Sequence, residues 1–328
     1  MRNASRTLSD IDVRNVTEIS VEGVDLIATA AGYEPRCTNL LTTLERDLRP
    51  EYIGERTLLV ELRSHRDAEA GVLADEVFRR FEPKYRFDAD TDDAFLLIDH
   101  VRHIVAQAPP RRRVIHVMVD YSCMSRMLYL SLLSLLGERI KLTFVYSIGK
   151  YGNAELNYPV AVVGDVRGVP GLEGLPLTSR PRLYVFGLGF DGVGALALAE
   201  RLEAERLVTF WADPGAKVNS AELVLQQNTR LVTRSVATCR TDLRDVASTV
   251  DVLRRFILET RATDKVVFVP VGPKPHILAA GIAAHGQDHA TLLAPHLRGG
   301  GIRDGIPPIE ASGELIVTAL TGPGAAAA

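Results

Sequence analysis

Short apolar runs alternate along the whole chain with stretches whose apolar residues recur at helical spacing. Residues 113–120, "RVIHVMVD", form a nearly continuous apolar run, which is typical of a strand buried on both faces. The next apolar stretch, "MLYLSLLSLL" at 127–136, has the length of a helix. Repeated strand–helix alternation predicts an α/β fold in which helices cover both faces of mostly parallel sheets.

The same reading gives an expected element order for each half of the chain. In the first half, strands are predicted at 24–32, 56–64, 113–120 and 141–149, with helices at 37–48, 68–81, 94–108 and 127–136. In the second half, strands are predicted at 182–189, 206–213, 230–238, 265–272, 290–295 and 313–320, with helices at 192–205, 219–228, 246–260 and 275–285.

A change in composition separates the two halves. Residues 164–181 contain four glycines and three prolines, which favour turns and connections over regular elements. We therefore predict an N-terminal Rossmann-like domain at 1–163, a connector at 164–181 and a C-terminal Rossmann-like domain at 182–328.

The two halves also share local patterns that predict an internal duplication. Gly32-Tyr33-Glu34 follows the first strand of the first half, and Gly189-Phe190-Asp191 follows the first strand of the second half, 157 residues later. The stretch around "VIHVMVDYSCMSR" aligns with "VVFVPVGPKPHIL" at an offset of 152 residues. The alternative is that any two doubly wound sheets share this rhythm.

Composition and charge narrow the classes of partner. A net charge of −3 with 24% charged residues does not favour an extended nucleic-acid surface or an anionic membrane as the main partner. The three cysteines form no CxxC motif, which argues against a disulfide scaffold and a zinc site. The N-terminal residues are polar and no apolar run reaches the length of about 18 residues expected for a membrane span. We therefore expect a cytoplasmic protein without a bound metal.

Ligands of open parallel sheets bind beyond the carboxyl ends of the strands, near the point where the strand order reverses. Gly187, Gly189 and Gly192 form a G-x-G-x-x-G pattern after a predicted strand, and Asp213 lies 21 residues beyond the last glycine. This spacing is the dinucleotide-binding fingerprint, with Asp213 as the acceptor for a ribose hydroxyl. Asp191 would place a negative charge beside the phosphates, and the alternative is a glycine turn that only packs a helix on a strand.

Charged and hydroxyl side chains follow two predicted strands of the first half. Glu34 and Arg36 come after Gly32, and Arg36 would bind a phosphate unless the two form a surface ion pair of little energetic value. The stretch "DYSCMSR" presents Asp120, Ser122, Ser125 and Arg126 between a strand and a helix, which suits a phosphate or nucleotide. Helix capping by Ser122 or Ser125 is the alternative. No G-x-S-x-G elbow and no histidine base accompany this stretch, so a nucleophile is not indicated.

The residues Asp120, Ser122, Ser125 and Arg126 also carry a family resemblance. The stretch "DYSCMSR" resembles the Asn-x-Thr-Gly-Gly-Thr-Lys motif of CRISPR-associated Rossmann-fold (CARF) sensor domains, with Cys123 and Met124 at the glycine positions. The resemblance implies a Rossmann-like domain that binds a cyclic oligonucleotide across a two-fold axis, which a tandem pair would mimic. Some such domains also cleave their ligand without a metal.

The sequence therefore predicts a sensor or regulatory protein that binds a nucleotide-type small molecule, in keeping with prokaryotic antiviral defence. An effector protein encoded nearby and a homodimer are compatible partners, and no particular cofactor is indicated. The alternatives are an enzyme that cleaves a nucleotide phosphodiester or glycosidic bond, with Ser122, Lys274 and His276 near the chemistry, and an NAD(P)-binding oxidoreductase. Lys274 is also a candidate ligand-binding residue, as are Arg298 and Arg303, which flank a glycine-rich loop that could hold an anion or be merely flexible.

Overall fold

The computed structural model describes residues 11–63, 69–90, 93–107, 114–137, 139–151, 163–175, 179–217, 219–297 and 308–322. The chain divides into two compact units. Ile11–Lys150 and Ile302–Ala328 form the first, which we call the split unit. Met1–Asp10 and Tyr151–Gly301 form the second, which we call the inserted unit because most of it interrupts the other in sequence.

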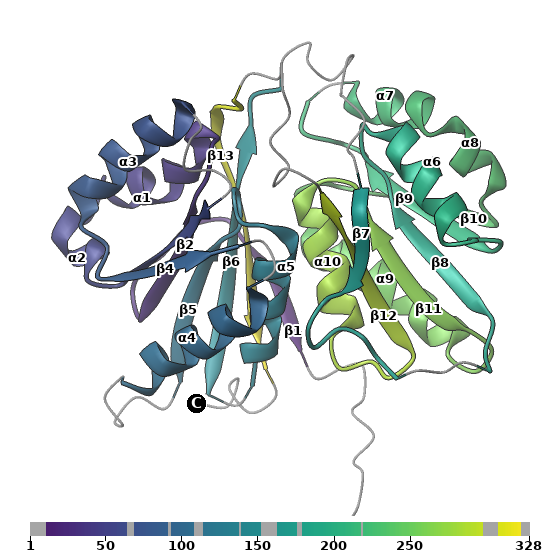
Figure 1. Ribbon diagram of the computed structural model, residues 1–328, viewed down its shortest axis with the longest axis horizontal. Coiled ribbons are helices and arrows are strands. Elements are labelled where there is room, and N and C mark those ends of the chain that lie inside the picture. The colour runs from purple at the N-terminus through teal and green to yellow at the C-terminus, as the bar shows by residue number, and fades with distance from the viewer. Residues whose placement is uncertain are drawn as a thin grey trace, which may run out of the picture. The chain divides into compact units, whose positions relative to one another are not determined.

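The described part of the split unit contains one mixed, mostly parallel seven-stranded sheet (Figure 1). Its strands are β1 (Asp12–Val16), β2 (Leu26–Ala31), β3 (Thr57–Leu62), β4 (Tyr85–Ala89), β5 (Ile115–Asp120), β6 (Ile140–Gly149) and β13 (Ala311–Thr321). Its helices are η1 (Pro35–Thr38), α1 (Asn39–Leu44), α2 (Pro50–Gly54), α3 (Glu69–Phe81), α4 (Ala94–Ala106), α5 (Arg126–Ser131) and η3 (Leu132–Leu135).

The described part of the inserted unit contains a six-stranded sheet of the same kind. Its strands are β7 (Val163–Gly168), β8 (Arg182–Gly187), β9 (Leu207–Ala212), β10 (Ala237–Thr241), β11 (Lys265–Pro270) and β12 (Ala290–Leu297). Its helices are α6 (Gly192–Arg201), α7 (Ser220–Gln227), α8 (Thr229–Arg234), α9 (Val246–Thr260) and α10 (Lys274–Ala284).

Both sheets place their parallel strands in the same order. In the split unit the order is β4-β3-β2-β5-β6, and in the inserted unit it is β10-β9-β8-β11-β12. Numbered along the chain, each is 3-2-1-4-5, the order of a doubly wound nucleotide-binding fold. Each fifth strand then pairs with an antiparallel strand, β13 on β6 and β7 on β12. The predicted fold class of two Rossmann-like sheets is confirmed, and the duplication stays a prediction.

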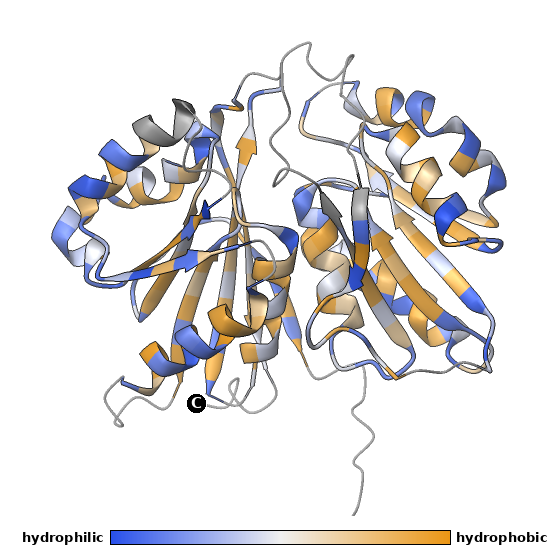
Figure 2. Ribbon diagram, in the orientation of Figure 1, coloured by the Kyte–Doolittle hydropathy of each residue, from blue (hydrophilic) through white to orange (hydrophobic). Residues whose placement is uncertain are grey.

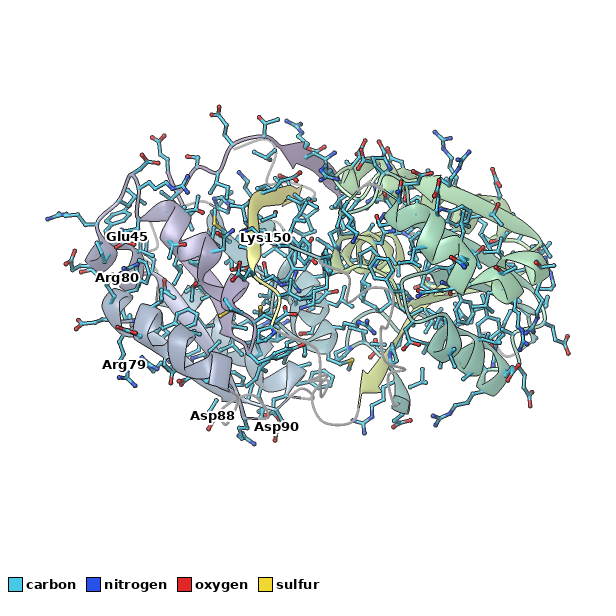
Figure 3. All side chains as sticks on the ribbon, turned by 90° about the horizontal axis from the view of Figure 1, so that it is seen from above. Glu45, Arg79, Arg80, Asp88, Asp90 and Lys150 are labelled. Carbon is cyan, nitrogen blue, oxygen red and sulfur yellow. The ribbon has the colours of Figure 1, made fainter. Side chains whose placement is uncertain are left out.

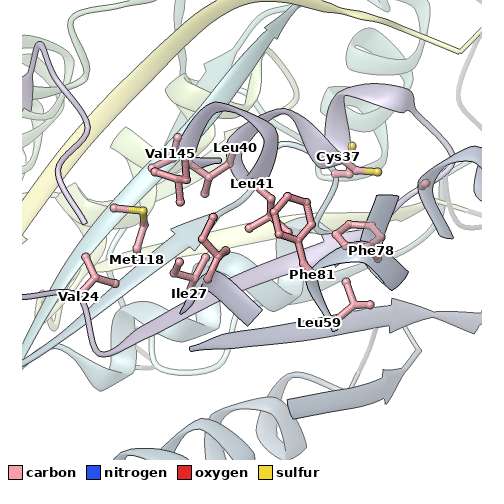
Figure 4. Close-up of a cluster of buried hydrophobic side chains, with 14 of the residues drawn as sticks. Val24, Ile27, Cys37, Leu40, Leu41, Leu59, Phe78, Phe81, Met118 and Val145 are labelled. Carbon is pink, nitrogen blue, oxygen red and sulfur yellow. The ribbon is translucent and has the colours of Figure 1, made fainter. Parts of the chain in front are cut away.

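Consecutive residues of β5 and β11 are buried, so apolar side chains lie on both faces of each sheet, and Figure 2 shows the central strands as mostly hydrophobic. In the split unit, one cluster joins Ile27, Leu59 and Met118 of the sheet to Leu41 and Phe78 of the covering helices (Figure 4). In the inserted unit, the corresponding cluster joins side chains of α6, α7 and α8 to β8, β9 and β11.

The structure differs from the predicted boundaries in two places. Strand β13 lies between β1 and β6, so the last strand belongs to the split unit although the prediction placed it in a domain at 182–328. Strand β7 falls inside the predicted connector and pairs with β12. Both differences arise because the antiparallel position beside the fifth parallel strand can be filled by any strand that the chain returns to the sheet, and local composition does not encode that choice.

Several local predictions also need correction. The stretch at 230–238, predicted as a strand, contains α8 and only the first residues of β10, because Leu231 and its apolar neighbours pack on the cluster beneath α6. The short elements β1, β4, β7 and α2 were not predicted, since five or six residues carry too little periodicity to identify.

Candidate functional site

The strand order brings together two loops of the split unit that the sequence analysis singled out. Strands β2 and β5 are parallel neighbours at the point where the strand order reverses. The loop that begins at Gly32 follows β2, and the loop that begins at Tyr121 follows β5. They meet closely, since a Cβ atom at Gly32 would lie 2.6 Å from the Cβ atom of Cys123.

Glu34 and Arg36 form a buried ion pair in this place. Their side chains are only 10% and 6% exposed, and the guanidinium Nε and Nη2 atoms lie 2.7 and 2.6 Å from one Glu34 carboxylate oxygen. The Nη1 group donates to the hydroxyl of Tyr146 at 2.9 Å and to the carbonyl oxygen of Ser147 at 3.2 Å. The pair is therefore neither a surface pair nor an open phosphate site, because a protein carboxylate and two further acceptors already hold the guanidinium.

Asp120 and Ser122 form a second buried network beside this pair. One carboxylate oxygen of Asp120 accepts a hydrogen bond from the backbone N–H of Ser122 at 3.0 Å. The hydroxyl oxygen of Ser122 accepts from the backbone N–H of Ser147 at 2.7 Å, and Asn39 donates to the Ser147 hydroxyl at 2.8 Å. Ser122 is fully buried. The observed bonds tie the β5 loop to the end of β6, and they do not present the Ser122 hydroxyl to solvent.

The remaining residues of the "DYSCMSR" stretch begin a short helix. Ser125 is the N-cap of α5, and its hydroxyl accepts from the backbone N–H of Leu128 at 3.3 Å. Ser125 therefore caps the helix, as the alternative to ligand binding predicted. Arg126 is half-buried in the first turn. A hydrogen bond with Cys37, together with burial, raises the pKa of the Cys123 thiol. That thiol stays protonated at neutral pH, which does not favour a nucleophile here.

In the inserted unit, the glycine pattern stands in the context that its fingerprint requires. Gly187 ends β8 and pairs with Phe210 of β9 on one side and Pro270 of β11 on the other. The turn then leads directly into α6. Strand, turn and helix thus follow one another at the point where the strand order reverses.

Packing within the protein accounts for all three glycines of this turn. A Cβ atom at Gly187 would lie 2.8 Å from the ring of Phe210, and one at Gly189 would lie 3.1 Å from the Cα atom of Gly272. At Gly192 the added atom would lie 2.0 Å from the backbone oxygen of Gln227. The glycines therefore allow the turn to fit against β9, the β11–α10 loop and α7. This agrees with the alternative in which the glycine turn serves packing.

The amino end of α6 carries a negative charge of the protein itself. Asp191 is the N-cap, and its carboxylate accepts from the backbone N–H of Gly194 at 2.8 Å. A phosphate group at the same helix end would meet this carboxylate. The amino end of α6 therefore disfavours a phosphate group.

Asp213 and Lys274 supply charge on the two sides of the glycine turn. Asp213 follows β9, and Lys274 is the first residue of α10, after β11. Both strands pair directly with β8. Lys274 is half-buried and the side chain of Asp213 is 38% exposed, with Arg240 at 3.5 Å from its carboxylate. The edge thus combines an acceptor for hydroxyl groups with a cation for a phosphate.

His276, predicted near the chemistry of an enzyme, lies in the core. Its ring is fully buried, lies 5.5 Å from the ring of Phe210, and shares a hydrogen bond of 3.2 Å with the Thr241 hydroxyl. Burial lowers the pKa of His276 to about 4. The imidazole is therefore neutral at physiological pH, as a core residue.

Arg298 and Arg303, predicted to flank an anion-holding loop, lie outside the described residues. Within the described ranges, no group of three or more His, Cys, Asp or Glu side chains could hold a metal ion. The described helices include none that is long and apolar enough to cross a membrane.

Sequence reasoning did not identify which side chains pair with the candidate residues at the strand ends of either unit. Tyr146 and Ser147 hold Arg36 from the end of β6, and the polar ending of "TFVYSIG" was the available signal. Arg240 was missed because the strand was placed at 230–238, which left the polar run "CRTDLRD" unassigned.

No protein-family model and no curated protein matches the chain. Among solved structures, the chain is similar to phosphoethanolamine N-methyltransferase 1 of Haemonchus contortus, solved in complex with phosphoethanolamine and S-adenosylhomocysteine. The identity is 9%, the match covers 80% of this chain and 73% of that one, and the TM-score is 0.19. A TM-score this low carries no argument about function.

Proposed function

We propose that the chain is a sensor or regulatory protein that binds a nucleotide-type small molecule at the carboxyl edge of the inserted unit. One observation carries the proposal. Strands β9 and β11 flank β8, so that Asp213 and Lys274 stand on the two sides of the glycine turn where the strand order reverses. A carboxylate can accept a hydrogen bond from a ribose hydroxyl, and an ammonium group can pair with a phosphate.

The resemblance to CARF domains supports prokaryotic antiviral defence as the setting, with an effector protein encoded nearby. The shared 3-2-1-4-5 order of both sheets supports two related domains, one of which is inserted into the other in sequence. The side chains of Asp120 and Ser122, which carry much of the resemblance, are engaged inside the split unit. The proposed ligand is therefore assigned to the inserted unit.

Burial supports a binding protein over the two enzyme alternatives. Ser122 and His276 are both fully buried, so neither reaches a substrate in this structure. Of the three residues proposed for bond cleavage, only Lys274 remains at the sheet edge. For an oxidoreductase, the glycine turn has the right context, but Asp191 occupies the helix end that would bind the pyrophosphate.

Calorimetry and thermal denaturation with ATP, NAD+, NADP+ and linear and cyclic oligoadenylates test the proposal, because a ligand that binds the folded state raises its melting temperature. Replacing Lys274 with alanine should weaken binding about 10- to 100-fold, as expected for a charge-assisted hydrogen bond of about 1.5–3 kcal/mol.

Lys265→Ala is the matched control, because Lys265 is the first residue of β11 and lies at the opposite end of that strand from α10, which Lys274 begins. It should leave the affinity unchanged. The proposal fails if no nucleotide raises the melting temperature, or if both variants weaken binding equally. Chromatography of the ligand after incubation separates binding from turnover, and consumption of the ligand would support the cleaving enzyme instead.

A further inference from the structure

Arg240 is a cation of the inserted unit's carboxyl edge that no motif indicated. Strands β9 and β10 are parallel neighbours in which Arg240 pairs with Trp211. The chain reaches Asp213 two residues after Trp211, and its backbone N–H donates to the carbonyl oxygen of Thr241 at 2.9 Å. This bond fixes the ends of the two strands against each other, so that the carboxylate and the guanidinium share one edge.

The two side chains are close but loosely paired. One guanidinium nitrogen of Arg240 lies 3.5 Å from one carboxylate oxygen of Asp213, and the side chains are 69% and 38% exposed. Within the described part of the chain, this is the one side-chain hydrogen bond or ion pair that either residue makes. The second carboxylate oxygen and most guanidinium donors therefore face no protein partner there, in contrast to Arg36 of the split unit, which Glu34, Tyr146 and Ser147 hold.

A ribose places two hydroxyl groups on adjacent carbons. If both are free, a carboxylate alone can accept from them, and a neighbouring arginine contributes little. If one of them carries a phosphate, the arginine can bind that phosphate through two parallel hydrogen bonds while the carboxylate accepts from the remaining hydroxyl. A second phosphate group in place of the free hydroxyl would be repelled by Asp213, so the pair distinguishes a singly phosphorylated diol from an unphosphorylated or doubly phosphorylated one.

We infer that the inserted unit selects a nucleotide that bears a phosphate on one ribose hydroxyl, with Arg240 holding that phosphate and Asp213 accepting from the adjacent free hydroxyl. This inference rests on the proposed function, since it concerns the same sheet edge. It adds the chemical class of the ligand and assigns Arg240 as the residue that determines specificity.

The test compares two pairs of probes by calorimetry: NADP+ against NAD+, and adenosine 2′,5′-bisphosphate or 3′,5′-bisphosphate against 5′-AMP. The wild-type protein should bind the ribose-phosphorylated member of a pair about 10-fold more tightly, the effect of one charge-assisted contact. Arg240→Gln should remove this preference, so that the two members of each pair bind with similar affinity. Asp213→Asn should weaken NAD+ more than NADP+, because the amide no longer repels phosphate and no longer neutralises Arg240.

Arg182→Gln is the matched control, since Arg182 is the first residue of β8 and lies at the amino ends of the parallel strands, opposite the proposed site. It should change neither affinity nor preference. The inference is overturned if the preference is absent in the wild-type protein, or if it survives in Arg240→Gln. In both cases Lys274-dependent binding of the unphosphorylated probes would leave the proposed function standing, whereas a lack of binding by every probe would remove the proposed function itself.

Discussion

The last strand of the chain should decide whether the split unit folds. Strand β13 comes more than 150 residues after β6 in sequence, yet it lies between β6 and β1 in the sheet. It pairs with both of them in antiparallel register. Deleting residues 302–328 therefore removes an interior strand, and we expect the split unit to lose its cooperative fold while the inserted unit keeps it.

The size of the effect follows from the side chains that the deletion removes. Ile316, Val317 and Leu320 are 4%, 5% and 0% exposed. Burying one aliphatic side chain of this size contributes about 1.5–3 kcal/mol, so the three contribute about 5–9 kcal/mol. Folded domains are stable by about 5–15 kcal/mol in total. The loss is thus of the same size as the whole stability of the split unit, before the lost hydrogen bonds of the ladder are counted.

The two units can be monitored separately in one urea titration. Trp211, the one tryptophan of the chain, lies in β9 of the inserted unit and is 5% exposed. Its fluorescence should show the same unfolding midpoint with and without residues 302–328. Circular dichroism, which reports both units, should lose the part of the transition that belongs to the split unit. An unchanged circular dichroism transition in the truncated protein would refute the reasoning.

The complementary variant should fold. The backbone N–H of Lys150 donates to the carbonyl oxygen of Glu310 at 2.8 Å, and Gly149 pairs with Ala311 (Lys150 is labelled in Figure 3). Residues 152–307 can therefore be replaced by a glycine-rich linker of about four residues, which is the usual length of a hairpin connection. A cooperative transition of residues 11–151 joined to 308–322 is the expected result, and an unfolded product would show that the split unit needs the inserted one.

Three further predictions concern single positions. Arg36→Met should lower the unfolding free energy of the split unit by about 3–5 kcal/mol, because it leaves the buried Glu34 carboxylate unpaired, and a double variant with Glu34→Leu should lose less than this single one in a urea titration. Gly192→Ala should destabilise the inserted unit, seen as a lower midpoint by Trp211 fluorescence, because the new methyl group meets a backbone oxygen at 2.0 Å. Burial holds the folded-state pKa of His276 at about 4, below its ordinary 6.5, so the unfolded chain binds the extra proton first and stability falls as the pH falls from 6.5 towards 4. We expect His276 to account for about 2 kcal/mol between pH 8 and pH 5, and His276→Gln to abolish that part of the loss.

The sequence predicts the parallel core of each sheet well because its signals are local. The strands at 113–120 and 265–272 are continuous apolar runs, and they are observed as β5 and β11. The position of β13 depends on which sheet edge the returning chain reaches, and nothing within residues 311–321 specifies that. The contact between α8 and the core likewise overrides the β-branched residues of "RLVTRSVAT", which favoured a strand.

The candidate sites were located better than their chemistry was interpreted. Position along the chain sufficed to place Gly32, Asp120, Gly189 and Lys274 at sheet edges, since each follows a strand that the apolar pattern reveals. Whether such a side chain faces solvent or another residue depends on contacts across 100 residues or more, such as that of Arg36 with Tyr146. The sequence shows that Glu34 lies two residues before Arg36, but it does not show that the two side chains are buried.

The common strand order allows the two reversal points to be compared directly. In the split unit, the cation at this point is Arg36, which is buried and already neutralised by Glu34. A phosphate could bind it only by displacing that carboxylate, which would leave Glu34 buried without its partner at a cost of about 3–5 kcal/mol. In the inserted unit, the side chain of Arg240 is 69% exposed and lies 3.5 Å from the Asp213 carboxylate, so a phosphate at Arg240 displaces mainly water. The same fold thus favours a ligand in one unit and opposes it in the other, and calorimetry should find one nucleotide per chain; two would mean that Glu34 gives up Arg36 to the ligand.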